Sequence, residues 1–218
     1  MSRMQFQQQV ERLVSLGYPG LLGVTSEEFE HVLRPLEEYV PSSAHTAGRA
    51  PTGTVDFVVV INARRVPVEA MLPLITRDGR QAVEHLYPKR PEEFVPIESL
   101  DLPDGEAYLL VGVDRGADTL NVTPDRAYQS IAARGRSPLT IAEGIALLTH
   151  VPELLQPNNC FSLLASRCGD RRVPALWLSA GRPKLGWCWA GNPHTWLGSA
   201  SCARRVGSVW FPSPVSAT

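Results

Sequence analysis

The first forty residues place apolar side chains at the spacing of helices. Apolar residues in the segment 4–16 recur three or four positions apart, which predicts an amphipathic helix. A second helix is predicted to follow Thr25, because Thr25 and Glu28 have the spacing of a capping box. Residues 1–40 are therefore predicted to form an N-terminal helical segment. Residues 41–53, which are rich in Ser, Ala, Gly, Thr and Pro, are predicted to be a flexible linker.

The rest of the chain, residues 54–218, is predicted to be one domain. A β-branched and aromatic run over Val55 to Ile61 is typical of a strand buried on both faces. A second strand is predicted over Ala107 to Val113, and a helix with a capping box is predicted to follow Thr140. After Pro157 short strands alternate with Gly, Pro and Asn turns. This order predicts an α+β fold with N-terminal helices, a mixed central sheet and antiparallel, Trp-rich C-terminal strands.

Charge is distributed unevenly along the chain. The formal net charge is −1, but the part from Pro157 onward has seven basic residues and one acidic residue. This part therefore carries +6 and the remainder carries −7. All four cysteines and all five tryptophans also lie in the basic part. Such asymmetry indicates an anionic partner, although the basic part could equally dock on the acidic part of the same chain.

The most informative stretch of the sequence is residues 186–196. Gly191-Asn192-Pro193 separates two aromatic runs, which predicts a β-hairpin in which Trp189 lies opposite His194. Because side chains alternate along a strand, Cys188 would then point to the opposite face. The side chains of the aromatic face would be Trp187, Trp189, His194 and Trp196. A shift of one residue in the pairing would reverse these faces.

This aromatic face leads to our main functional hypothesis. We expect it to border a site for a small anionic or planar molecule in a binding protein or an enzyme, with Arg172 and Arg204 among the ligand-binding residues. The predicted turn at Gly169-Asp170 is surrounded by Arg167, Arg171 and Arg172, and arginines there could clamp a phosphate or carboxylate. The structural alternatives are a Trp-rich core and a solvated turn.

A nucleophilic cysteine is a second chemical hypothesis. Cys202 follows the small-residue segment 198–201, whose amides could approach a reacting oxygen. Arg204 and Arg205 could lower the pKa of its thiol, and His194 could act as the base. No third group that would orient the base is evident, so a Gly- and Ser-rich turn before a final strand is the simpler interpretation.

Two other classes of function stay open. The four cysteines and His194 have the chemistry of zinc ligands, but no two of them form the short Cys pair of a zinc site, so we predict no metal and no cofactor. The same Arg and Trp residues could instead serve a module that binds another protein or single-stranded nucleic acid. The acidic remainder of the chain argues against nucleic acid. The oligomeric state is not indicated by the sequence.

The hydropathy pattern indicates where in the cell the protein is located. No apolar run reaches the roughly 18 residues that a membrane helix needs. Gln7, Gln8 and Gln9 occupy the place where a secretory signal would have its apolar stretch. We therefore expect a cytoplasmic protein.

Four segments carry a resemblance to a known family. They are 136–144 (RSPLTIAEG), 172–177 (RVPALW), 183–189 (PKLGWCW) and 191–198 (GNPHTWLG). The chain resembles, over most of its length, an actinobacterial family of unknown function. The resemblance implies a bacterial cytosolic protein and brings no activity, ligand or catalytic residue with it.

Overall fold

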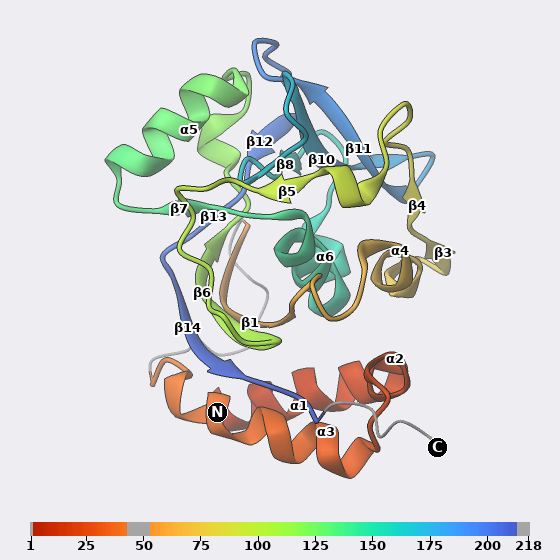
Figure 1. Cartoon of the computed structure of the whole chain (residues 1–218). Coiled ribbons are helices and arrows are strands. Elements are labelled where there is room, and N and C mark those ends of the chain that lie inside the picture. Colours follow the sequence, from red (N-terminus) through yellow and green to blue (C-terminus); the bar gives the residue numbers. More distant parts are fainter. Residues whose placement is uncertain (1, 43–52, 213–218) are drawn as a thin grey trace.

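The computed structural model describes residues 2–42 and 53–212 (Figure 1). Its α-helices are α1 (Ser2–Ser15), α2 (Tyr18–Leu22), α3 (Ser26–Leu33), α4 (Val68–Met71), α5 (Pro124–Ala133) and α6 (Ile141–His150). Short 3-10 helices are η1 (Arg34–Tyr39), η2 (Leu72–Leu74), η3 (Pro91–Glu93), η4 (Ala117–Thr119) and η5 (Pro152–Leu154). The strands are β1 (Thr54–Ile61), β2 (Thr76–Arg77), β3 (Arg80–Gln81), β4 (Val83–Glu84), β5 (Val95–Pro96), β6 (Ala107–Asp114), β7 (Ser137–Pro138), β8 (Cys160–Ser162), β9 (Ser166–Arg167), β10 (Arg172–Ser179), β11 (Arg182–Trp189), β12 (Leu197–Ser199), β13 (Ser201–Cys202) and β14 (Arg204–Val209).

Two five-stranded sheets form the framework. In the first sheet β6 is central, with β1 on one side and both β13 and β14 on the other, and β7 continues beyond β13. All these pairs are antiparallel. The second sheet has the order β12-β8-β10-β11-β4 and is mixed, because β12 runs parallel to β8 and β4 runs parallel to β11.

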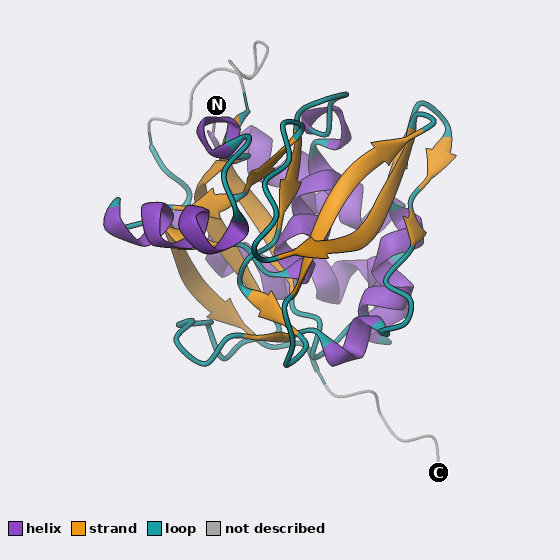
Figure 2. Ribbon diagram, turned by 90° about the horizontal axis from the view of Figure 1, so that it is seen from above, coloured by secondary structure: helices purple, strands orange, loops and turns teal. Residues whose placement is uncertain are grey.

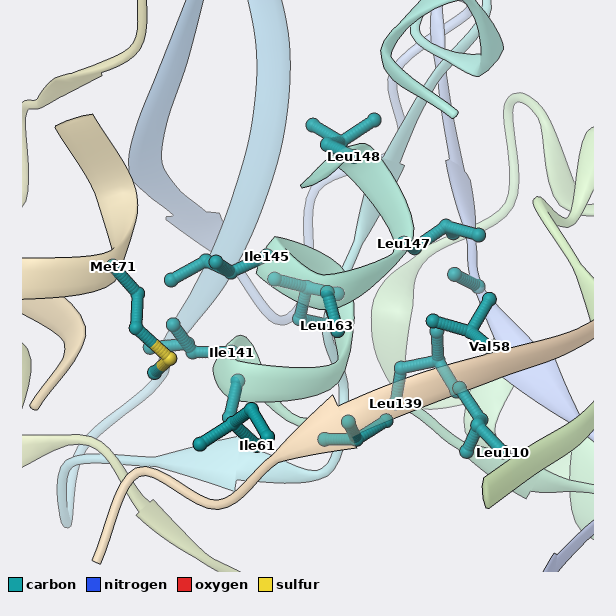
Figure 3. Close-up of a cluster of buried hydrophobic side chains, with 14 of the residues drawn as sticks. Val58, Ile61, Met71, Leu110, Leu139, Ile141, Ile145, Leu147, Leu148 and Leu163 are labelled. Atoms are coloured by element: carbon teal, nitrogen blue, oxygen red, sulfur yellow. The ribbon is translucent and has the colours of Figure 1, made fainter. Parts of the chain in front are cut away.

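Helix α6 lies in the core and contacts β1 of the first sheet and β10 of the second. Every residue from Ile141 to Thr149 is buried, as expected for a helix that is apolar around its whole circumference. Figure 3 shows Ile145 and Leu147 of α6 among buried side chains from β1 and neighbouring segments. Gly144 allows α6 to pack closely against Leu163, since a Cβ at residue 144 would lie 2.5 Å from the Leu163 side chain.

The N-terminal helices α1 and α3 lie beneath the first sheet (Figure 1), and their apolar residues belong to the same hydrophobic core as the sheets. One polar side chain of α1 joins this helix to β1. The Gln9 amide donates to the Phe57 carbonyl at 3.0 Å and accepts from the Val59 amide at 2.8 Å. Gln9 thus occupies the place that a neighbouring strand would take along the edge of β1.

Much of the predicted architecture is confirmed. The fold is α+β, with N-terminal helices, a mixed sheet and antiparallel pairs, and Figure 2 shows its helices and strands in one body. The strands predicted near residues 55–61 and 107–113 are β1 and β6. The capping boxes at Thr25 and Thr140 are both formed. Of the predicted linker 41–53, residues 43–52 lie outside the described part of the chain.

The predicted hairpin over residues 186–196 is wrong. Trp189 pairs with Arg172, not with His194, because β11 forms its hairpin with the preceding strand β10. The two residues between them, Ala180 and Gly181, both have positive φ, at 50° and 75°. Such two-residue turns match the twist of paired strands and hold a long hairpin in register. The segment that follows Trp189 instead leads to β12, which joins the sheet beside β8.

Candidate functional site

The first group of predicted site residues lies on one face of the β10–β11 hairpin. Arg172 is the cross-strand partner of Trp189, and Trp187 lies two residues away on the same face. The Arg172 guanidinium carbon lies 4.5 Å from the Trp187 ring centroid and 5.0 Å from that of Trp189. Arg172 also pairs with Asp170. Trp189 keeps 41% of its surface exposed, and neighbouring Tyr87, whose carbonyl accepts from the Trp187 indole, keeps 86%.

The other predicted aromatic residues pack elsewhere. Trp196 lies against Trp177, with ring centroids 6.3 Å apart, and against His194, with centroids 5.2 Å apart. Trp177 points to the face opposite Trp187, over Gly186, where a Cβ would lie 2.1 Å from its ring. The predicted wall of Trp187, Trp189, His194 and Trp196 is therefore divided into two groups on opposite faces of the hairpin, which follows from the corrected strand pairing.

The predicted nucleophile lies in the core. Cys202 in β13 is fully buried, and burial raises the pKa of its thiol to about 12. A nucleophilic cysteine needs an accessible thiolate, so this environment is that of an inert thiol. Arg204 is exposed on β14. Arg204 therefore does not share an open site with Cys202. The charge of Arg205 does lower the pKa of the Cys202 thiol, as predicted, but burial outweighs it.

The charged group beside Cys202 is a buried ion pair. Arg205 of β14 donates from Nε and Nη2 to the two carboxylate oxygens of Glu143 at 2.5 and 2.8 Å. Tyr108 donates to the same carboxylate at 2.9 Å, and Arg205 also reaches Ser137 and the Pro138 carbonyl. Burial opposes the charge on Arg205, but the hydrogen bonds and charge of Glu143 outweigh it and raise the pKa of Arg205. Because these groups satisfy one another, the pair is structural.

A different arginine lines an accessible cavity. Arg167, in β9, borders a cavity of about 680 Å³. The strand β9 pairs with β5, so Arg167 lies opposite Val95. The remaining walls come from the segment after β5, the first turns of α5 and the end of the β8 segment. They are formed by Ile97, Ser99, Asp125, Tyr128, Gln129 and Leu164.

The electrostatic environment of Arg167 is unusual. Its Nη1 atom is buried and has no hydrogen-bond partner within residues 2–42 and 53–212. Burial lowers the pKa of the Arg167 guanidinium, and the negative charge of Asp125 opposes this shift only in part. A partly buried guanidinium without an acceptor is unfavourable, since a charge loses hydration and gains no hydrogen bond. An anion bound in the cavity would supply a counter-charge to this guanidinium and acceptors for its Nε and Nη2 atoms, while the buried Nη1 atom itself stays out of reach of a ligand.

The polar groups opposite Arg167 are weakly restrained. The Ser99 and Tyr128 hydroxyls lie 3.4 Å apart at an exposed position. Asp125 is exposed in the first turn of α5, where its carboxylate is favoured by the helix dipole. The cavity thus combines one cation, one anion, hydroxyl groups and the apolar side chains of Ile97 and Leu164.

Sequence reasoning found only part of this site. Arg167 was identified as a possible anion clamp, but at a turn together with Arg171 and Arg172. Neither Asp125 nor Tyr128 is among the predicted site residues. The helical spacing of Asp125 and Tyr128, three residues apart on α5, was the available hint that both face the same side.

Two further cavities lie elsewhere. One of about 470 Å³ lies between α1, β1 and His150, whose buried Nδ1 has no partner in the described part of the chain. Burial lowers the pKa of His150 to about 3, so its imidazole is neutral. The other, of about 500 Å³, is an apolar groove that includes Phe94 and Val95. The first cavity is also lined by charged residues, among them Arg12 and Glu153, but the Arg12 guanidinium already donates to the Thr149 carbonyl.

Neither a metal-ligand group nor a membrane-spanning helix is found among the described residues. Across residues 2–42 and 53–212 no group of three or more His, Cys, Asp or Glu side chains is placed to hold a metal ion. In the same residues no helix combines the length and apolar character required to cross a bilayer.

Comparison with protein-family models matches residues 12–208 to a family described as a family of unknown function, DUF5701. The chain belongs to this family. The DUF5701 match spans all the residues of the Arg167 cavity and all the predicted site residues. No curated protein and no solved structure matches the chain. Since DUF5701 has no assigned activity, the function has to be argued from the site itself.

Proposed function

We propose that the protein binds a small anionic molecule at Arg167, as a binding protein or enzyme of bacterial metabolism in the cytoplasm. The observation that carries this proposal is the partly buried guanidinium without an acceptor, on the wall of a cavity of about 680 Å³. The resemblance of the sequence to actinobacterial proteins supports the bacterial source.

The chemistry of arginine favours a carboxylate or phosphate as the bound group. A guanidinium presents several N–H donors in a planar fork that matches two oxygens of such an anion. The Nε and Nη2 atoms of Arg167 form no hydrogen bond in the described part of the chain and are not sealed from solvent, whereas Nη1 is buried. These two nitrogens are therefore the donors with which we expect Arg167 to bind a ligand.

The rest of the cavity suits the body of a small molecule. Its volume lies within the range of roughly 300–1,000 Å³ that is usual for ligand sites. Ile97 is partly buried and gives the cavity an accessible apolar side, whereas Leu164, the other apolar lining residue, is fully buried. The Tyr128 ring, which is also partly buried, can contact a planar or aliphatic group.

Thermal shift and calorimetric titration test the proposal. The probes are citrate, glucose 6-phosphate and adenosine monophosphate, with glucose and adenosine as neutral counterparts. At least one anion is expected to stabilise the wild type and to bind with measurable heat, and the neutral counterparts are not. In Arg167→Gln this binding is expected to fall at least tenfold.

Arg126→Gln is the matched control. Arg126 lies on α5 next to Asp125, is exposed and does not line the cavity, so the variant makes the same charge change outside the site. Anion binding that is equal in Arg167→Gln and wild type would overturn the proposal. So would the absence of binding by every probe that carries a carboxylate or phosphate, zwitterionic amino acids included.

A second candidate function rests on the exposed aromatic surface of Tyr87, Trp187 and Trp189 around Arg172. The exposed indole ring of Trp189, beside a guanidinium that it stacks with, favours contact with a partner protein or with single-stranded nucleic acid. Trp189→Ala would abolish such contact and leave anion binding at Arg167 unchanged. Phosphate contacts with nucleic acid would weaken steeply with added salt, while an apolar protein contact would not.

A further inference from the structure

The Arg167 cavity also contains a carboxylate. Asp125 lines the same cavity as Arg167 and acts on it through charge, but the two side chains form no ion pair in the described structure. A direct ion pair with an exposed carboxylate such as Asp125 gains little free energy, so both charges remain available to a ligand.

The backbone holds the two residues in place. Asp125 is the second residue of α5, and its amide donates to the Ala190 carbonyl at 3.2 Å, which fixes the start of the helix against the loop after β11. Arg167 is fixed by the pairing of β9 with β5. The cavity thus presents a positive and a negative group from two anchored elements.

An apolar surface lies beside this pair of charges. Leu164 and Ile97 form it, and neither offers a polar side-chain atom. A ligand that matched only Arg167 would leave Asp125 facing an anion, which is unfavourable. A ligand that also carried a positive group would satisfy both residues and place an apolar substituent on Leu164 and Ile97.

We propose that the ligand is a zwitterion of the α-amino-acid class. Its carboxylate would bind Arg167, its ammonium group would bind Asp125, and its side chain would lie against Ile97 and Leu164. This inference rests on the proposed function, since it names the class of anion that the Arg167 site binds.

The test compares ligands that differ in one charge. The full-length protein is titrated with leucine, phenylalanine and glutamine, with their N-acetyl derivatives, and with isoamylamine and phenethylamine. At least one free amino acid is expected to bind. Its N-acetyl derivative, which lacks the ammonium group, and the matching amine, which lacks the carboxylate, are each expected to bind at least tenfold more weakly.

Variants assign the two charges to the two residues. Arg167→Gln is expected to lose binding of both the free and the acetylated amino acid. Asp125→Asn is expected to weaken the free amino acid about tenfold and to leave the acetylated one unchanged or stronger. Arg126→Gln, next to Asp125 but outside the cavity, is expected to bind like the wild type.

The outcomes separate the two proposals. If acetylated and free amino acids bind equally well and Arg167→Gln abolishes both, the zwitterion inference fails and anion binding at Arg167 stands. If Arg167→Gln binds every ligand as the wild type does, or no anionic or zwitterionic probe binds, both proposals fail. If Asp125→Asn does not fold, the comparison of ligands on the wild type still decides.

Discussion

Two arginines of the basic C-terminal part, Arg205 and Arg167, have opposite environments. Arg205 keeps 4% of its side chain exposed and forms a bidentate pair with Glu143, with further bonds to Ser137 and Pro138. Arg167 is also partly buried, yet its Nη1 has no acceptor in the described residues. Glu143 raises the pKa of Arg205, whereas burial lowers the pKa of Arg167.

The comparison shows that burial of a charge alone does not identify a functional site. The Arg205 cluster would attract attention as a group of ionisable residues around a cysteine, but each member satisfies another. Arg167 lacks this satisfaction and borders a cavity, so it is the residue with unused binding capacity. Arg115 is also buried and keeps an unpartnered Nε, but its Nη1 donates to the Leu154 carbonyl at 2.8 Å.

The largest effect is expected from breaking the satisfied pair. Glu143→Gln keeps the shape of the side chain but leaves Arg205 buried without its counter-charge. We expect a loss of about 3–5 kcal/mol in the free energy of unfolding, measured by urea denaturation. The double variant Glu143→Leu/Arg205→Met should recover much of this loss. A loss below about 1 kcal/mol in Glu143→Gln would show that the pair is not tightly coupled to the fold.

Alkaline pH is expected to act on the same cluster. Burial raises the pKa of Cys202 to about 12 from an ordinary value of 9.0, so the unfolded chain loses this proton first. Stability from this group is thus fully present below pH 9 and is lost as pH rises toward 12. The unfolding free energy should fall over this window, and Cys202→Ser should make the decline shallower. An identical pH profile in the variant would contradict the buried thiol.

A smaller effect of opposite sign is expected at the unsatisfied arginine. Arg167→Met removes a partly buried charge that has no acceptor, so without ligand the stability should stay equal or rise by as much as about 1 kcal/mol. Arg205→Met should instead destabilise strongly. Parallel urea titrations of both variants provide the measurement. A marked loss of stability in Arg167→Met would show that Arg167, like Arg205, is stabilised by its surroundings in the absence of ligand.

The smallest effect is expected at the rim of the cavity. Tyr128→Phe removes only the exposed contact of 3.4 Å with Ser99. We expect the free energy of unfolding to change by less than about 0.5 kcal/mol. The same measurement on Tyr108→Phe should show a clear loss, because the Tyr108 hydroxyl donates to buried Glu143. Equal losses of unfolding free energy in Tyr128→Phe and Tyr108→Phe would show that the hydroxyl at the rim of the cavity stabilises the fold as much as the buried one.

Local signals in the sequence predicted much of the fold. Capping boxes at Thr25 and Thr140 act within four residues, so they could be recognised without tertiary information. The hairpin of residues 186–196 was misassigned because two turns competed for β11, and only their relative geometry decides between them. Because β11 pairs with β10 and not with the segment after Trp189, its aromatic side chains have other neighbours than the sequence predicts.

The candidate site was harder to predict than the fold. Asp125 and Arg167 are far apart in the sequence. They line the same cavity because of the tertiary fold, in which α5 begins against the loop after β11. Likewise, the capping role of Glu143 was visible in the sequence, but its bond to Arg205 depends on the pairing of β14 with β6. Neither the shared cavity of Asp125 and Arg167 nor the pair of Glu143 and Arg205 produces a periodic pattern in the sequence.

The amide of Gln9 has a consequence for the behaviour of the protein at high concentration. Because it covers the Phe57 carbonyl and the Val59 amide, a second molecule cannot extend the first sheet at that point. We therefore expect Gln9 to limit self-association through this edge of β1. A residue without an amide at position 9 would leave the Phe57 carbonyl and the Val59 amide without these partners.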